Sequence, residues 1–273
     1  MAEKANILDA IAALDHVLDS IGPLAVAVSG GVDSMTLAHA AHRRLNGKAI
    51  MYHALSPAVP PEASTRVERQ AAREGWRLEL INAGEYNDPD YLKNPVNRCF
   101  FCKNSLYGRI AGLTDKTIVS GTNLDDLGDY RPGLQAAERY SVRHPYVEAA
   151  IDKSTLRAMA RVFGLNDIAE LPAAPCLSSR IETGIPITAT DLNFVHQVER
   201  MIETVLQPET VRCRVRRDGV EVQLDPASLA RLTSSAGIEL RQRIIQACRE
   251  RGYDDKPVLA AYQRGSAFLR ESS

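Results

Sequence analysis

Residues 24–44 read LAVAVSGGVDSMTLAHAAHRR, and the two halves of this stretch follow different hydrophobic patterns. The apolar run at 24–28 predicts a short buried strand. Residues 34–45 predict a helix that ends near Asn46 and Gly47. A strand that turns sharply into a helix leaves backbone N–H groups unpaired at the helix start, where the helix dipole is positive. The stretch therefore predicts a strand–loop–helix unit with an anion site at its turn.

The loop between this strand and helix, SGGVDS, contains residue types that suit a phosphate group. Gly30 and Gly31 let the backbone approach phosphate oxygens and adopt dihedral angles closed to other residues. Ser29 and Ser34 add hydroxyl donors, and Asp33 can hold a magnesium ion that bridges phosphates. The loop is shorter than the P-loop of phosphoryl-transfer enzymes and lacks its lysine. It therefore suits the pyrophosphate released by attack at the α-phosphorus of ATP; the alternative is a simple glycine turn that caps a helix.

The rest of the chain divides into two regions with different patterns of predicted secondary structure. Up to about residue 150, strands and helices alternate, with strands expected at 48–55, 77–81 and 117–119 and helices at 7–21, 64–74 and 103–113. This alternation predicts an α/β fold, a Rossmann-like parallel sheet with helices on both faces. Beyond that point, helices at 154–163, 191–206 and 228–249 and a hairpin around Asp218-Gly219 predict a smaller α+β domain. We therefore expect two domains, 1–150 and 151–273.

Composition excludes several classes of protein. The 273 residues are 45% hydrophobic and 25% charged, which is typical of a soluble globular chain. A net charge of −1 gives no general attraction to nucleic acid or to an anionic membrane. No apolar run approaches the roughly 20 residues of a membrane span, and the N-terminal stretch lacks the pattern of a secretory signal. We expect a cytoplasmic protein that binds neither nucleic acid nor membrane.

A second polar stretch, SGTNLDD at 120–126, follows the strand expected at 117–119. Its Gly121, Asn123, Asp125 and Asp126 would lie at the carboxyl edge of the sheet, where open α/β folds bind ligands. An Asx-rich turn is the alternative. Together with the first loop, the stretch predicts a nucleotide site.

Five cysteines, an odd number, indicate thiols, metal ligands or catalysts in a reducing compartment. Cys99 and Cys102 form C-x-x-C, and Cys176 follows 74 positions after Cys102 (176 − 102). A zinc site, a redox dithiol and an iron–sulfur site are all possible for C-x-x-C. Three thiolates without a close fourth ligand suit a four-iron cluster with one open iron. Cys213 and Cys248 are expected to be buried small hydrophobes.

The order of the motifs resembles one known family. SGGVDS matches the PP-loop ATP pyrophosphatase signature, and four further stretches resemble the LarE family of ATP-dependent sulfur transferases: RCFFCK, GTNLDDLGDYRPGLQA, CLSSRIETGIPIT and RVRRDG. The resemblance implies that ATP and magnesium adenylate a carboxylate of pyridinium-3,5-biscarboxylate mononucleotide. Pyrophosphate leaves, and sulfur then replaces AMP to give a thiocarboxylate of the nickel-pincer nucleotide pathway. It also implies an adenylating domain at 1–150, a sulfur-transfer domain at 151–273, and a homo-oligomer.

Family members differ in their source of sulfur. In one type, the cysteine matching Cys176 gives up its own sulfur and becomes dehydroalanine. In the other, three cysteines hold a four-iron, four-sulfur (4Fe-4S) cluster that passes on an extra sulfide. Because Cys99, Cys102 and Cys176 are all present, the resemblance implies the cluster type, with a sulfide donor as partner.

The resemblance also assigns residues to the substrate. It implies that Arg214 and Arg216 bind the substrate phosphate, for which arginine forks are well suited, and that Ser179 and Arg180 bind that phosphate or orient the acyl group. It places Glu199 as an acidic residue at the sulfur-transfer site. For the arginines, a solvated hairpin face is the alternative. The main rival function is a PP-loop tRNA thiolation enzyme, which would need a basic surface for the RNA backbone.

Overall fold

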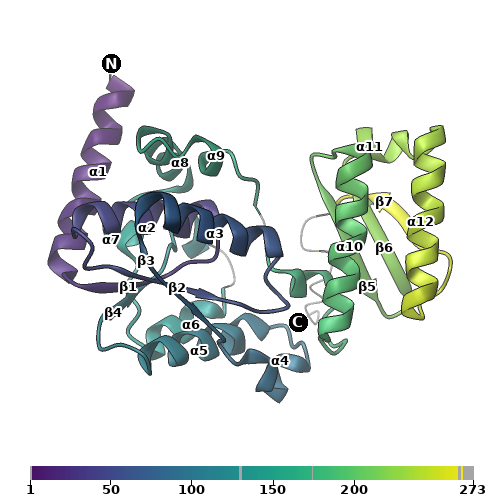
Figure 1. Ribbon diagram of the computed structural model, residues 1–273, viewed down its shortest axis with the longest axis horizontal. Coiled ribbons are helices and arrows are strands. Elements are labelled where there is room, and N and C mark those ends of the chain that lie inside the picture. Colours follow the sequence, from purple (N-terminus) through teal and green to yellow (C-terminus); the bar gives the residue numbers. More distant parts are fainter. Residues whose placement is uncertain (1, 129–130, 174, 264–265, 267–273) are drawn as a thin grey trace. The chain divides into compact units, whose positions relative to one another are not determined.

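The computed structural model describes residues 2–128, 131–173, 175–263 and 266, with side chains from residue 6 onward. The chain forms two compact units (Figure 1). Unit 1 comprises Met1–Asp88 and Cys99–Ala174, and unit 2 comprises Pro89–Arg98 and Pro175–Ser273. The short segment Pro89–Arg98 is therefore part of unit 2, although its neighbours in sequence belong to unit 1.

Unit 1 contains a four-stranded parallel sheet in the order β3-β2-β1-β4. Its strands are β1 (Leu24–Ala27), β2 (Ile50–Ala54), β3 (Arg77–Ile81) and β4 (Thr117–Val119). Its helices are α1 (Ala2–Ile21), α2 (Val32–Arg44), α3 (Pro61–Glu74), α5 (Arg98–Ala111), α6 (Gly133–Arg139), α7 (Pro145–Glu148), α8 (Lys153–Val162) and α9 (Asn166–Ala169). The predicted α/β class is confirmed.

Alternate side chains of β1 enter two separate cores, as the pleat of a strand requires. Leu24 and Val26 pack in a cluster that also contains residues of α1, α2, α8 and α9. Ala25 and Ala27 pack on the other face with residues of α5 and α6. The helices therefore cover both faces of the sheet (Figure 1), and this burial on both sides explains why β1 is an uninterrupted apolar run.

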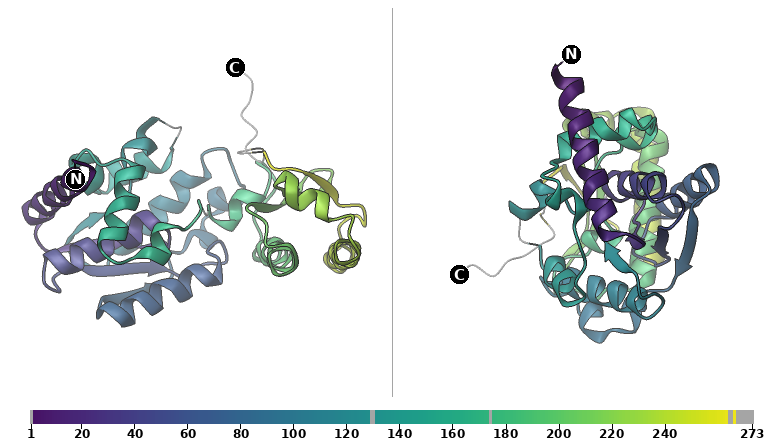
Figure 2. Two further views of the ribbon diagram at one scale, coloured as in Figure 1. Left: turned by 90° about the horizontal axis from the view of Figure 1, so that it is seen from above. Right: turned by 90° about the vertical axis from the view of Figure 1, so that its left-hand side faces the viewer.

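Unit 2 contains a three-stranded sheet in the order β5-β6-β7. The hairpin of β5 (Val211–Arg216) and β6 (Gly219–Leu224) is antiparallel, with Arg216 opposite Gly219, and confirms the prediction. The edge strand β7 (Val258–Ala261) runs parallel to β6 and was not predicted. Helices α10 (Ala189–Leu206) and α12 (Ser235–Arg251) lie side by side on one face of the sheet (Figure 2), and the shorter α4 (Pro89–Leu92) and α11 (Pro226–Arg231) complete the unit.

Two boundaries differ from the sequence-based expectation. Helix α5 begins at Arg98 rather than at Lys103, so C-x-x-C lies within its first five residues and not in the irregular stretch before it. The helix starts early because Arg98 N donates to Pro95 O at 3.0 Å, which closes a turn immediately before it. Helices α8 and α9 belong to unit 1, so the units change at residues 174–175. The functional roles expected for 1–150 and 151–273 stay predictions. Within the described parts of the chain, no helix combines the length and apolarity of a membrane span.

Candidate active site

The first glycine-containing loop joins β1 to α2 and is held in a conformation that requires glycine. Gly30 has φ +82°, and a Cβ there would lie 2.7 Å from Ala63 O. Arg66 Nη1 donates to Gly30 O at 2.8 Å, and Ser34 Oγ accepts from Ser29 N at 3.0 Å. No side chain of the described residues caps α2 at Gly31. The backbone N–H groups of the first helical turn therefore remain available to an anion.

The second loop packs directly on the first. A Cβ at Gly121 would lie 2.8 Å from both Asp33 C and Ser34 N, so only glycine allows this approach. Asn123 Nδ2 then donates to Asp33 Oδ1 at 3.3 Å. Asn123 Oδ1 accepts from Asp125 N at 3.1 Å, which forms the expected Asx turn. Asp126 Oδ2 accepts from Asn123 N at 3.2 Å. The structure thus brings the two loops together at Asp33, as expected of neighbouring parallel strands.

A lysine that sequence reasoning missed also reaches this point. Lys153 Nζ lies 2.5 Å from Asp33 Oδ1 and 2.6 Å from Oδ2, and its backbone N donates to Asp125 Oδ2 at 3.2 Å. Lys153 begins α8, directly after the N-cap Asp152. Both side chains of the Lys153–Asp33 pair are about a third exposed, 32% and 30%. The first loop has no lysine of its own, but Lys153, which is 120 positions from Asp33 in the sequence, places an ammonium group there.

Two histidines, the buried His53 and the half-buried His144, support the loops. His144 Nδ1 and Ser120 Oγ are 2.9 Å apart at the start of the second loop. His53 bridges the first loop to α3, with Nδ1 2.8 Å from Val28 O and Nε2 2.8 Å from Ser64 Oγ. Burial lowers the pKa of both histidines. They are consequently neutral near pH 7 and act as hydrogen-bonding supports.

In unit 2, Cys176 is exposed and stands directly before the 3₁₀ turn Leu177–Arg180. The backbone oxygen of Cys176 accepts from Ser179 N at 3.0 Å and from Ser179 Oγ at 2.7 Å. Arg180 Nη1 donates to Pro175 O at 2.7 Å and to Cys176 O at 3.2 Å. The turn therefore holds the backbone of Cys176 while its side chain remains accessible.

Arg180 is anchored by Glu199, which projects from α10. Arg180 Nε and Nη2 donate to the two carboxylate oxygens at 3.0 and 2.9 Å, and Cys213 N donates to Oε1 at 2.8 Å. The side chains are only 5% and 7% exposed. Burial by itself would lower the pKa of Arg180, but the charge and hydrogen bonds of Glu199 outweigh it and raise that pKa. Arg180 and Glu199, both predicted site residues, therefore form a buried ion pair with each other.

The two arginines of the R-x-R motif have different surroundings. Arg214 donates to Gln223 Oε1, Ser179 O and Gln263 O at 2.9, 3.2 and 3.3 Å, and all three acceptors are neutral. Burial, with further repulsion from neighbouring arginines, lowers the pKa of Arg214 to about 10. Arg216 is instead paired with two carboxylates, those of Glu182 and Glu221. Of the two, Arg214 is the cation whose described contacts include no carboxylate.

The cysteines divide between the units. Cys99 is exposed and Cys102 half-buried on α5 of unit 1, whereas Cys176 belongs to unit 2. Cys213 and Cys248 are buried, as predicted, and burial raises the pKa of Cys248 to about 11. Among the residues that the structure describes, no three His, Cys, Asp or Glu side chains are grouped to hold a metal ion. The iron–sulfur cluster stays a prediction.

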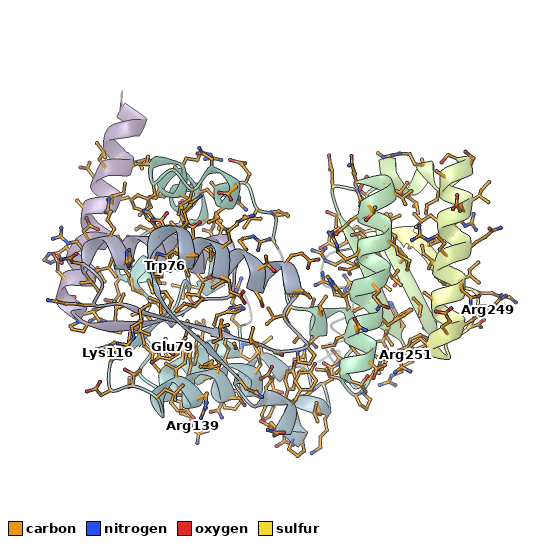
Figure 3. The ribbon with its side chains drawn as sticks, in the orientation of Figure 1. Trp76, Glu79, Lys116, Arg139, Arg249 and Arg251 are labelled. Atoms are coloured by element: carbon orange, nitrogen blue, oxygen red, sulfur yellow. The ribbon has the colours of Figure 1, made fainter. Side chains whose placement is uncertain are left out.

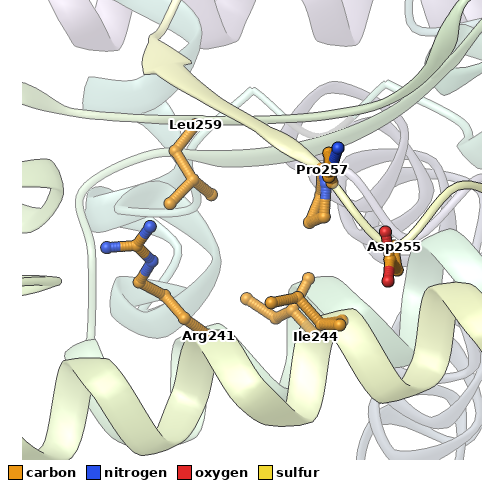
Figure 4. Close-up of a pocket in the computed structure, with 7 residues that line it drawn as sticks. Arg241, Ile244, Asp255, Pro257 and Leu259 are labelled. Carbon is orange, nitrogen blue, oxygen red and sulfur yellow. The ribbon is translucent and has the colours of Figure 1, made fainter.

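Two other features of unit 2 lie apart from these residues. A cavity of about 240 Å³ (Figure 4) contains none of the predicted site residues in its lining of Arg241, Ile244, Ile245, Asp255, Lys256, Pro257 and Leu259. The basic end of α12 (Figure 3) is neutralised by ion pairs, Arg249 with Asp255 and Arg251 with Asp191, each at 2.7 Å. These arginines therefore do not form an unbalanced basic patch.

Comparisons with known proteins agree with the order of motifs. No family model matches the sequence. The chain is 35% identical over 217 residues to an uncharacterized protein of Synechocystis sp., covering 78% of this chain and 80% of that one. It is 26% identical over 225 residues to the pyridinium-3,5-bisthiocarboxylic acid mononucleotide synthase of Lactiplantibacillus plantarum, covering 80% of each. With two glycine-containing loops joined at Asp33 and these relatives, the chain belongs to the LarE family.

Proposed function

We propose that the protein is an ATP-dependent sulfur transferase that acts on pyridinium-3,5-biscarboxylate mononucleotide. The observation that carries the proposal is the meeting of the two loops at Asp33, beside a helix start without a side-chain cap. The bisthiocarboxylic mononucleotide named for the Lactiplantibacillus relative is the product that such a reaction would give. A carboxylate itself has a poor leaving group, so adenylation must precede the attack of sulfur.

In the first step, a substrate carboxylate oxygen attacks the α-phosphorus of ATP, an acyl adenylate forms and pyrophosphate leaves. The N–H groups of the first turn of α2 and the hydroxyls of Ser29 and Ser34 would bind the leaving phosphates. Asp33 offers a half-buried carboxylate, the kind of oxygen ligand that magnesium prefers. Asp33 would hold a magnesium ion, which would supply positive charge for the leaving pyrophosphate, and the ammonium of Lys153 beside it would add to that charge.

In the second step, sulfur attacks the acyl carbon, the new C–S bond forms and AMP leaves. A 4Fe-4S cluster bound by Cys99, Cys102 and Cys176 would supply a sulfide at its open iron. The alternative is that Cys176 itself supplies the sulfur, and the exposure of Cys176 supports it. Its thiolate attacks the adenylate, and loss of the Cα proton with cleavage of the Cβ–S bond leaves dehydroalanine and a thiocarboxylate.

The surroundings of Arg214 make it the best candidate ligand for the substrate phosphate. Its described hydrogen-bond acceptors are neutral, and its buried charge lies among other arginines. An incoming phosphate dianion would compensate that charge through a bidentate contact. Arg180 and Arg216 already face carboxylates, so we assign them to supporting the site.

The test is a reaction of anaerobically prepared protein with ATP, magnesium and the biscarboxylate mononucleotide, followed by analysis of pyrophosphate and of nucleotide mass. We expect substrate-dependent pyrophosphate release and a thiocarboxylate product. Cys176→Ala should keep pyrophosphate release and lose the thiocarboxylate, because the two steps use different groups. Cys248→Ala, which changes a buried cysteine of the same unit, is the matched control. Absence of substrate-dependent pyrophosphate release, or sulfur found in tRNA instead, would refute the proposal.

A further inference from the structure

The segment Pro89–Arg98 occupies an unusual position in the chain. It lies between η1 (Glu85–Asn87) and the body of α5, both in unit 1, but it packs within unit 2. Two backbone hydrogen bonds attach it to the residues that follow the Cys176 turn. Gly184 N donates to Asn94 O and Ile187 N to Leu92 O, each at 2.9 Å. The segment thus supports a part of the chain about ninety positions away.

Asn94 is the centre of this support. Its side chain is fully buried, and its Nδ2 donates to the backbone oxygens of Ile181, Glu182 and Ile185 at 3.3, 2.9 and 3.0 Å. Its Oδ1 accepts from Arg98 Nη1 at 2.9 Å. Asn94 also has φ +54°, in the left-handed region that asparagine tolerates better than most residues. The residue is therefore selected both by backbone conformation and by its polar contacts.

A second contact reaches the Cys176 turn itself. Tyr91 OH and Ser178 Oγ are 2.7 Å apart, and both residues are 1% exposed. Ser178 stands two positions after Cys176 within the 3₁₀ turn. Because a buried hydroxyl pair is costly to break, this bond fixes the turn from the side of the inserted segment. Arg180 also holds the backbone at the start of this turn, through Pro175 O and Cys176 O.

We infer that Tyr91 and Asn94 are positioning residues for the thiol of Cys176. The inference rests on the proposed function only in the choice of reaction. Sulfur transfer demands that the sulfur-bearing group meet the acyl carbon within a narrow range of distance and angle. An exposed cysteine on an unsupported turn would lose that orientation. The segment's last residue, Arg98, also immediately precedes Cys99, so the support of the Cys176 turn is continuous in sequence with the C-x-x-C helix.

Asn94→Gly is the decisive variant, because glycine keeps the left-handed backbone and removes only the side-chain bonds. Asn46→Gly is its matched control, since Asn46 also has positive φ (+48°) but is exposed on a turn of unit 1. Two quantities are measured: the thiocarboxylate formed per pyrophosphate released, and the rate of Cys176 alkylation by iodoacetamide, followed by peptide mass analysis. Tyr91→Phe, which deletes one oxygen, is measured in parallel in case Asn94→Gly does not fold.

We expect Asn94→Gly to lower the product per pyrophosphate at least about tenfold, as loss of about 1.4 kcal/mol of positioning energy would. It should also change the alkylation rate of Cys176, which Asn46→Gly should leave unchanged, and Tyr91→Phe should have both effects more weakly. Wild-type ratios and rates in both variants would overturn the inference. If the wild-type protein shows no sulfur transfer, the proposed function fails, and the alkylation rates alone decide the inference.

Discussion

Lys153 carries the most direct prediction at the scale of single residues. Its ammonium is the only cation among the described contacts of the Asp33 carboxylate. Replacing it with methionine keeps the apolar stem and removes the charge that would face the departing phosphates. We expect Lys153→Met to reduce kcat for pyrophosphate release by about 10²-fold, the usual effect of losing one preorganised electrostatic group. Steady-state pyrophosphate assays with saturating ATP measure this.

Lys48→Met is a suitable control, since Lys48 is an exposed residue of the same unit. A Lys153→Met enzyme with normal kcat and a raised KM for ATP would contradict this role, because it would show that the lysine binds the ground state and the transition state equally.

The local sequence indicated Asp33 as a candidate site residue, but it did not indicate that Lys153 contacts it. The residues of the first loop were identifiable because glycine, serine and aspartate follow a buried strand within six positions. Lys153 and Asn94 gave no such signal, because their contacts join residues 120 and up to 91 positions apart. Such a contact exists only after the sheet and the two units have formed. An isolated lysine or asparagine in the sequence has no pattern that reveals it.

At the scale of elements, α10 and the Cys176 turn are joined by the Arg180–Glu199 pair. Glu199→Gln would leave the guanidinium of Arg180 buried without its counter-charge, which typically costs about 3–5 kcal/mol. We expect a loss of this order in the free energy of unfolding, measured by urea denaturation. Glu203→Gln, on the same helix but in an exposed pair with Arg200, should change it little.

The same variant separates two roles of Glu199. A carboxylate that acts as an acid or base would lose sulfur transfer on amidation while stability stays near normal. The structure favours the supporting role, because both carboxylate oxygens already accept hydrogen bonds from Arg180 and Cys213. Normal stability combined with lost sulfur transfer would therefore contradict our assignment.

At the scale of the whole molecule, the alternation of strands and helices predicted the parallel sheet, and the Asp218-Gly219 signal predicted the hairpin. The sequence did not predict that a segment of unit 2 lies between two segments of unit 1 along the chain. Pro89–Arg98 lies in a stretch rich in proline and asparagine, which reads as a loop of the first domain. Its membership of unit 2 depends on hydrogen bonds from Asn94 and Tyr91 to residues 178–187. Strand β7 was not predicted because it is an edge strand of only four residues.

The division of the cysteines between the units gives the last prediction, which concerns the assembled chain. If Cys99, Cys102 and Cys176 together bind a 4Fe-4S cluster, protein purified without oxygen should be brown and contain about four irons per chain. Alanine at any one of these positions should reduce the iron content and the visible absorption, whereas Cys248→Ala should not, because Cys248 is buried. Colourless, iron-free protein that still forms thiocarboxylate would contradict the cluster. Its intact mass would then have to fall by one hydrogen sulfide per chain, because Cys176 would be the remaining source of sulfur.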